Sequence, residues 1–432
     1  MKKKILAIIL TAVTTFSLIG CGANNNTKPA NETSGGSGKK TVTVWAWDPK
    51  FNIAIMNEAK ALYEKENPNV EINVVDFAKT DVEQKLHTIL ASGTNKDLPE
   101  IVLIEDYNSQ KYIQSYPGAF EDLTSKMPFN EFAQYKTKIT TVDGKTYGVP
   151  FDSGVTGYYY RTDILKQAGF KEEDLNNITW EQFIEIGKVV KEKTGKPMLA
   201  IDPSDLGLLR TILNGAGTWY FDKDGNPYFT QNEALKEGLQ VMKTMLDTGV
   251  ASMYSGWADF LKGFHSGAVA GVATGVWITP SVMQEESQKG LWRIAPTPRL
   301  QVKGAVNASN LGGSSWYVLS GSENKDSAIE FMKSVYTNKD FYQTILTKNG
   351  AVASYLPSMD GEAYKKQSDY FGGQAIYAEM TKWMKEVPSV SYGMYTYEAE
   401  SILAAGFNEF LKGKPIDEVL KSVEEQVKMQ IK

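Results

Sequence analysis

The sequence predicts an α/β fold in which each domain contains a mainly parallel sheet flanked by helices. Between residues 41 and 105, three β-branched, apolar segments alternate with two segments whose apolar residues recur at helical spacing. This alternation is typical of parallel sheets covered by helices on both faces. The chain has 432 residues, more than one hydrophobic core usually serves, so we expect two domains.

The first elements can be placed from the sequence. Strands are predicted at TVTVWAW (41–47), VEINVVDF (70–77) and EIVLIE (100–105), and helices at 51–66 and 81–92. Ligands of such sheets bind beyond the carboxyl ends of the strands. This rule indicates the residues that follow the first and third strands as candidate ligand contacts.

The sequence becomes more helical from about residue 153. TWEQ at 179–182 is a capping box that predicts a helix to about residue 193. Short strands are expected at 268–274 and 314–320. Further helices are expected at 204–213, 231–247, 256–265, 324–336, 339–348, 370–386, 398–412 and 415–430.

The N-terminus has the pattern of an export signal. Three lysines precede an apolar run that is too short for a confident membrane span, which needs roughly 20 apolar residues. We therefore predict a signal peptide at 1–20; the alternative is a retained membrane anchor. LIGC resembles the lipobox of bacterial lipoproteins, so we expect Cys21, the single cysteine of the chain, to be lipidated. The Gly-, Ser- and Asn-rich stretch 21–40 predicts a flexible tether.

Charge and motifs exclude several other classes of protein. A formal net charge of −5 argues against binding to nucleic acid, which favours basic surfaces. The chain lacks HExxH, GxSxG and P-loop motifs, so we expect no enzyme, no metal site and no cofactor. Asp222, Asp224, Asn226 and Glu233 match an EF-hand loop in part, but Pro227 stands where that loop needs glycine. DKDGNP is better explained as a hairpin turn.

Several segments in order resemble the extracellular solute-binding proteins of carbohydrate ABC transporters, which are related to maltose-binding protein. The segments are NPNVEINV, KTYGVPFDSGVTGYYYRTDILKQAGF, TWEQFIEIGKVVKEKTGKPML, FHSGAVAGVATGVWI and SGSENKDSAIEFMKSV. The resemblance extends over nearly all of residues 41–432. YPGAFEDLT and NLGGSSWYVLS resemble members that take arabino- or xylo-oligosaccharides.

The resemblance implies a two-lobed, periplasmic-binding-protein-like fold with a three-segment hinge and a sugar in the interlobe cleft. Lobe one is expected at 41–150 plus 312–353, and lobe two at 151–311 plus 354–432. The hinge segments are expected near Pro150, Asn310 and Ala353.

A sugar presents apolar ring faces and polar edges, so we expect aromatic rings and carboxylates in the cleft. Trp277 matches the ring-stacking tryptophan of the family, and Tyr397 lies where the family supplies an aromatic residue. Each tryptophan could instead be core, and Asp48 could cap the first helix. The expected ligand contacts are Trp277, Trp219, Trp257, Tyr397, Asp48, Asp106, Asp152, Trp47, Trp316 and Glu398.

The expected function is high-affinity capture of an oligosaccharide and its delivery to the permease subunits of an ABC importer. The protein is expected to be a monomer at the extracytoplasmic face of the cell membrane, attached only by its lipid. Two alternatives remain from the sequence: binding of a peptide or polyol, and a secreted glycoside hydrolase, which would need two suitably spaced carboxylates.

Overall fold

The computed structural model describes residues 39–431. The predicted signal peptide, Cys21 and most of the predicted tether lie outside these residues. Among the described helices, none is both long and apolar enough to cross a bilayer.

The first sheet has the strand order β2-β1-β3-β12-β6. Its strands are β2 (Val70–Asp76), β1 (Lys40–Ala46), β3 (Ile101–Glu105), β12 (Ser314–Val318) and β6 (Gly148–Pro150). β1 pairs in parallel with β2 and β3, whereas β12 runs antiparallel to both β3 and β6. The parallel alternation predicted for residues 41–105 is therefore confirmed, and a strand from far along the chain completes the sheet.

The second sheet differs from the prediction of a mainly parallel arrangement. Its order is β10-β7-β11, and β7 (Thr156–Arg161) runs antiparallel to β10 (Gly271–Gly275) and β11 (Trp292–Ala295). β7 follows β6 directly, so no crossover helix sets its direction relative to its neighbours. A parallel pair, β8 (Leu199–Ile201) with β9 (Ala251–Met253), lies next to β10. β4 (Thr141–Val142) and β5 (Lys145–Thr146) form a small hairpin.

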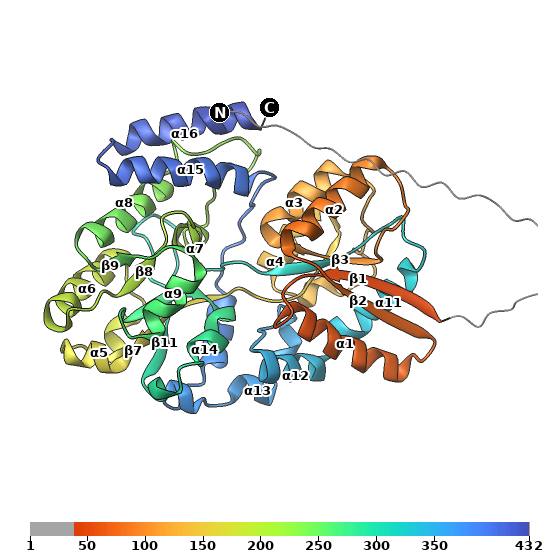
Figure 1. Ribbon diagram of the computed structural model, residues 1–432, viewed down its shortest axis with the longest axis horizontal. Coiled ribbons are helices and arrows are strands. Elements are labelled where there is room, and N and C mark those ends of the chain that lie inside the picture. The colour runs from red at the N-terminus through yellow and green to blue at the C-terminus, as the bar shows by residue number, and fades with distance from the viewer. Residues whose placement is uncertain (1–38, 432) are drawn as a thin grey trace, which may run out of the picture. The chain divides into compact units, whose positions relative to one another are not determined.

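Helices surround both sheets (Figure 1). Their bounds are α1 (Asn52–Glu66), α2 (Lys79–Ser92), α3 (Asp106–Ser115), α4 (Gln134–Ile139), α5 (Thr162–Gln167), α6 (Trp180–Thr194), α7 (Gly207–Gly215), α8 (Glu233–Asp247), α9 (Gly256–His265), α10 (Thr279–Val282), α11 (Lys325–Tyr336), α12 (Lys339–Asn349), α13 (Glu362–Lys365), α14 (Ile376–Met384), α15 (Thr396–Leu411) and α16 (Ile416–Gln430).

Local sequence signals explain some of the helix ends. Thr179 and Gln182 form the predicted capping box at the start of α6, where the Gln182 amide donates to Thr179 Oγ1 over 3.3 Å and the Thr179 amide to Gln182 Oε1 over 2.9 Å. The helix predicted at 370–386 is shorter than expected. Gly372 and Gly373 both have positive φ angles, and α14 begins only after them. Glycine disfavours the helix interior, which accounts for the delay.

The turn at 222–227 is held by one carboxylate. Asp222 Oδ1 accepts hydrogen bonds from the amides of Asp224 and Asn226, each 2.9 Å long. An antiparallel bridge between Phe221 and Pro227 closes the turn, as in a hairpin. Within residues 39–431, no group of three or more His, Cys, Asp or Glu side chains is arranged to hold a metal ion.

Three chain segments connect the two sheets, and they lie side by side. The amide of Ser153 donates to Val352 O, and the amide of Leu311 donates to Gly154 O, both over 2.9 Å. A Cβ on Gly154 would lie 2.2 Å from Leu311 O, so this close approach requires glycine. The predicted hinge positions Pro150, Asn310 and Ala353 belong to these segments; the residue bounds of the lobes remain predictions.

Candidate ligand-binding cleft

A cleft of about 1030 Å³ lies where the first sheet, the connecting segments and the second group of strands and helices meet. Its walls include the residues after β1 and β3, the 311–314 segment, and residues of β8, α7, α9 and β10. The volume is at the upper end of that of small-molecule sites. The strand-end rule applied to the sequence therefore located this cleft.

Aromatic rings form one wall of the cleft. The rings of Trp257 and Trp277 have centroids 6.0 Å apart at an interplanar angle of 42°, and Trp257 stacks on Phe260 at 5.7 Å. Trp257 is 52% exposed, so about half of its surface is open to a ligand. Trp47 and Phe51, from the loop between β1 and α1, line the same cleft.

The local sequence places these rings. Trp257, Phe260 and Leu261 are spaced i, i+3 and i+4 along α9, so they share one side of that helix. The indole N–H of Trp277 donates to Leu311 O over 2.9 Å, which fixes the ring against a connecting segment. A Cβ on Gly275 would lie 2.2 Å from Trp277 Nε1, so glycine at 275 makes room for the indole.

Carboxylates also reach the cleft. Asp48 lines it in a left-handed conformation (φ 63°), and its Oδ1 accepts from the amides of Lys50 and Phe51. These amides precede α1, whose N-cap residue is Phe51 without a side-chain hydrogen bond, so Asp48 holds the turn before the helix and does not cap it. Asp152 lines the cleft as well and accepts from the Ser314 amide over 2.8 Å. Burial raises the pKa of Asp152, and nearby Lys136 opposes that rise.

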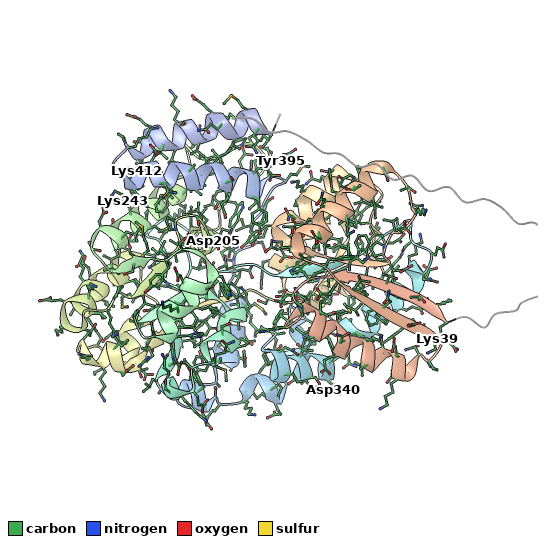
Figure 2. All side chains as sticks on the ribbon, viewed as in Figure 1. Lys39, Asp205, Lys243, Asp340, Tyr395 and Lys412 are labelled. Atoms are coloured by element: carbon green, nitrogen blue, oxygen red, sulfur yellow. The ribbon has the colours of Figure 1, made fainter. Side chains whose placement is uncertain are left out.

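Arg210 places a guanidinium in the cleft beside two carboxylates. It lines the cleft from α7 and pairs with Glu400 and with Asp205, the latter over 2.7 Å (Asp205 is labelled in Figure 2). Its guanidinium lies 5.4 Å from the centroid of the Tyr107 ring. Burial raises the pKa of Glu400, and Arg210 lowers it. The two carboxylates outnumber the guanidinium, so this part of the cleft has no excess positive charge and suits an uncharged ligand better than an anion.

Asp106 does not line the cleft. Its carboxylate is fully buried, pairs with the equally buried Lys136, and accepts from Ser315 Oγ over 3.0 Å. Lys136 Nζ also donates to Ser314 O over 3.1 Å. The pair therefore supports Gly313 and Ser314, which line the cleft, and its role is to position the backbone.

Trp219 and Trp316 are also buried, contrary to the expectation that they contact ligand. Trp219 is 1% exposed, stacks on Tyr107 at 5.6 Å and donates to Thr396 Oγ1 over 2.9 Å. Trp316 is fully buried in β12, a strand with neighbours on both sides, and packs against Phe151. We withdraw Asp106, Trp219 and Trp316 as direct ligand contacts.

Tyr397 and Glu398 lie at the start of α15, outside the lining of the cleft. The Tyr397 hydroxyl donates to Glu105, and Glu398 pairs with Lys111 of α3. Burial raises the pKa of Tyr397, and the neighbouring Glu105 raises it further. Tyr397 thus connects α15 to β3, and Glu398 connects it to α3; Glu105, at the end of β3 where the strand-end rule applies, lines the cleft.

Sequence reasoning missed other lining residues. Phe260 could have been found, because it lies three residues after Trp257 on the same predicted helix. Tyr107 follows the third strand, where the strand-end rule applies, whereas Arg210 lines the cleft without a local signal. Their position depends on contacts with Glu400 and Gly312, which are distant in the sequence.

A two-lobed α/β fold with an aromatic cleft in which carboxylates outnumber cationic side chains is typical of a solute-binding protein for uncharged ligands. The chain belongs to the bacterial extracellular solute-binding protein family, whose model matches residues 58–371. The resemblance seen in the sequence is thereby confirmed, and the family places its members outside the cytoplasm.

Individual relatives agree with this assignment. The chain is 52% identical to a lactose-binding protein of Rhizobium radiobacter over 90% of this chain and 93% of that protein. It is 23% identical to an arabinooligosaccharide-binding protein of Bacillus subtilis over 77% and 75% of the two chains. The sugar-binding protein MalE of Xanthomonas citri has the same fold, with a TM-score of 0.77 at 17% identity, covering 90% of this chain and 96% of that one. The Bacillus subtilis protein agrees with the resemblance to arabino-oligosaccharide-binding members seen in the sequence. This chain is, however, far more similar to the lactose-binding protein.

Proposed function

We propose that the cleft captures an uncharged oligosaccharide, with the β-galactoside disaccharide lactose as the first candidate, for delivery to the permease of an ABC importer. The observation that carries this proposal is the aromatic wall of Trp257, Phe260 and Trp277, in a cleft also lined by Trp47 and by carboxylates. The 52% identity to a lactose-binding protein supports the choice of sugar.

The chemistry of a sugar matches this arrangement. The C–H face of a pyranose ring packs on an indole, and its hydroxyl groups need acceptors and donors at the ring edge. Asp48 and Asp152 are the proposed acceptors, and the Arg210 guanidinium is a proposed donor. Hydrogen bonds to ionised groups are the stronger ones, so they orient the sugar as well as hold it.

Titration calorimetry with lactose tests the proposal. We expect saturable binding to one site, and we expect Trp277→Ala to weaken it by about tenfold or more, equivalent to about 1.4 kcal/mol. Trp383→Ala is the matched control, because Trp383 is a partly buried tryptophan of α14 that does not line the cleft. Its affinity for lactose is expected to equal that of the wild type.

Two results would reject the proposal. One is the absence of binding to lactose and to arabino-oligosaccharides alike. The other is chemical change: chromatography of the sugar after long incubation is expected to return it intact, and cleavage products would indicate a glycoside hydrolase instead.

We also propose that Cys21 carries a lipid that attaches a monomeric protein to the extracytoplasmic face of the membrane. The LIGC sequence after an apolar run supports this, because acyl chains contribute about 0.8 kcal/mol per buried CH₂. In cells that express the full chain, Cys21→Ala is expected to move the protein from the detergent phase to the aqueous phase or leave it unprocessed. A Ser37→Ala variant, changed within the same tether, is expected to partition like the wild type. Unchanged partitioning of Cys21→Ala would contradict the anchor.

A further inference from the structure

A second cavity, of about 620 Å³, adjoins the cleft. Asp202 and Ser204 line both spaces, so the two meet at the segment after β8. Asp202 is fixed there, because its Oδ1 accepts from the Ser204 amide and its Oδ2 accepts from the Gly256 amide over 2.7 Å. The segment that lines both cavities is therefore held in place by hydrogen bonds, one of them to the start of α9.

Helix α9 separates the two cavities and presents a different face to each. Trp257, Phe260 and Leu261 line the cleft. The other face lines the second cavity with Asp259, Lys262, Gly263 and Ser266, at i, i+3, i+4 and i+7. The two spaces meet where Asp202 and Ser204 line both, so a chain-like ligand bound on the aromatic face can continue over this segment to the polar face.

Tyr254 forms an aromatic surface in the second cavity. It lies just after β9, where its amide donates to Ile201 O over 2.9 Å. Its ring packs against the backbone of α9: a Cβ on Gly263 would lie 3.0 Å from the ring. Glycine at 263 thus allows the tyrosine ring to lie close on the helix, with its remaining surface toward the cavity.

Several polar groups of this cavity have no partner within the described residues. Over residues 39–431, no intrachain hydrogen bond or ion pair engages the Tyr254 hydroxyl, the Asp259 carboxylate or the Lys262 ammonium group. Asn408 of α15 donates its amide N–H to Ala404 O, which leaves its carbonyl oxygen to accept. A ring with hydroxyl-binding groups around it is the chemistry of a sugar subsite.

We propose that this second cavity binds the additional units of a saccharide longer than the disaccharide held in the cleft. Tyr254 supplies the stacking surface, Asp259 accepts from sugar hydroxyls, and Lys262 donates to them. This inference rests on the proposed sugar-binding function of the cleft, and it identifies the ligand class as oligosaccharides of three or more units.

The test compares ligands that differ only in length. The purified protein is titrated by calorimetry with lactose, with β-1,4-galactosyl-lactose and with the corresponding tetrasaccharide. We expect one of the longer sugars to bind about fivefold or more tightly than lactose, a difference well within the range of a few added contacts. Tyr254→Ala and Asp259→Asn are each expected to remove most of this gain while lactose affinity stays within about twofold of the wild type.

Tyr228→Ala is the matched control, since Tyr228 is a half-buried tyrosine that lines neither cavity. Thermal melts verify folding, and Tyr254→Leu, which keeps a large apolar side chain without the ring, replaces Tyr254→Ala if that variant unfolds. Equal affinity for lactose and the longer sugars would contradict sugar binding in the second cavity. A gain in affinity that survives both substitutions would contradict it as well. Neither result affects the proposed function of the cleft. Failure of every sugar to bind would overturn both.

Discussion

Lys136 and Asp106 form a fully buried ion pair beneath the floor of the cleft. Burial raises the pKa of Asp106 to about 6, although Lys136 and Ser315 lower it. A Cβ on Gly313 would lie 2.7 Å from Lys136 Nζ, so the pair packs directly against a glycine whose φ angle is +98°. The pair therefore holds the cleft floor in a conformation that few other residues adopt.

Removing one partner of this pair is expected to be costly. Lys136→Met leaves Asp106 buried without its counter-charge, so we expect the free energy of unfolding at pH 8 to fall by about 3–5 kcal/mol. The loss is expected to be smaller at pH 4, because the raised pKa of Asp106 lets the folded variant take up a proton that neutralises the carboxyl group. Urea denaturation at the two pH values measures both effects.

The double variant Lys136→Met with Asp106→Asn is the control. It removes both charges, so we expect it to lose less stability than Lys136→Met alone. Equal losses for the single and double variants would show that packing, and not the unpaired charge, accounts for the effect.

The Lys136–Asp106 pair shows why the role of a side chain is harder to predict from the sequence than its position in the fold. Asp106 was correctly located at the end of a strand near the cleft. Its burial depends on Lys136, 30 residues further along, and on Ser315, more than 200 residues further along. No local pattern reports such contacts. Trp257 differs, because its exposure follows from its place on the first turn of a helix that the sequence itself predicts.

Among the contacts between elements, hydrogen bonds to the Glu424 side chain connect α16 to the segment before α8. Glu424 accepts from the amide of Thr230 over 2.8 Å, from its hydroxyl over 2.7 Å, and from the Phe229 amide over 3.2 Å. Lys428 pairs with the same carboxylate at 2.6 Å. Partial burial raises the pKa of Glu424, but the hydrogen bonds from Lys428 and Thr230 more than offset this and bring it to about 2.

We expect Glu424→Gln to lower the free energy of unfolding at pH 7 by about 1–2 kcal/mol, because hydrogen bonds to an ionised acceptor become bonds to a neutral one. The carboxylate's contribution is present above its unfolded-state pKa, near 4.5, and is lost as the pH falls through about 2. The gap between variant and wild type is therefore expected to close over that range. Melting curves across pH measure it, with the exposed neighbour Glu425→Gln as control; a gap independent of pH would contradict the argument.

Element boundaries were predicted where a local chemical signal existed. The Thr179–Gln182 capping box placed the start of α6 correctly, and β1, β2 and β3 followed their β-branched patterns. The antiparallel second sheet could not be predicted in this way. The direction of β7 depends on its direct connection from β6, and its neighbours β10 and β11 come from more than 100 residues further along the chain.

For the whole molecule, the cleft is assembled from segments that are far apart in the sequence. Residues near 48, 105, 152, 205, 257, 277 and 312 all line it. The sequence predicted Asp48, Asp152, Trp47, Trp257 and Trp277 at this location through strand ends and family resemblance. It did not predict Arg210, because the exposure of that side chain depends on how the elements pack, whereas Glu105 lies at the strand end that the sequence indicated.

The last prediction concerns closure. The cleft is lined by the β1–α1 loop on one side of the connecting segments and by α9 and Trp277 on the other, so a ligand that contacts both sets of residues stabilises the form in which they are near each other. Trp277 also donates to Leu311 O of a connecting segment, which couples the stacking ring to the hinge. Hinge closure around a ligand is known for periplasmic binding proteins as a group.

Small-angle scattering is expected to show a smaller radius of gyration with saturating lactose than without it. At a lactose concentration of 100 times Kd, thermal denaturation is expected to show a stabilisation of about 2.7 kcal/mol. Trp277→Ala, with its Kd about tenfold higher, is expected to be stabilised by only about 1.4 kcal/mol at the same concentration, whereas Trp383→Ala is expected to behave like the wild type. A melting temperature that rises while the radius of gyration stays constant would mean that lactose binds without closing the cleft, and the coupling through Leu311 would then have no role in signalling the bound state to a transporter.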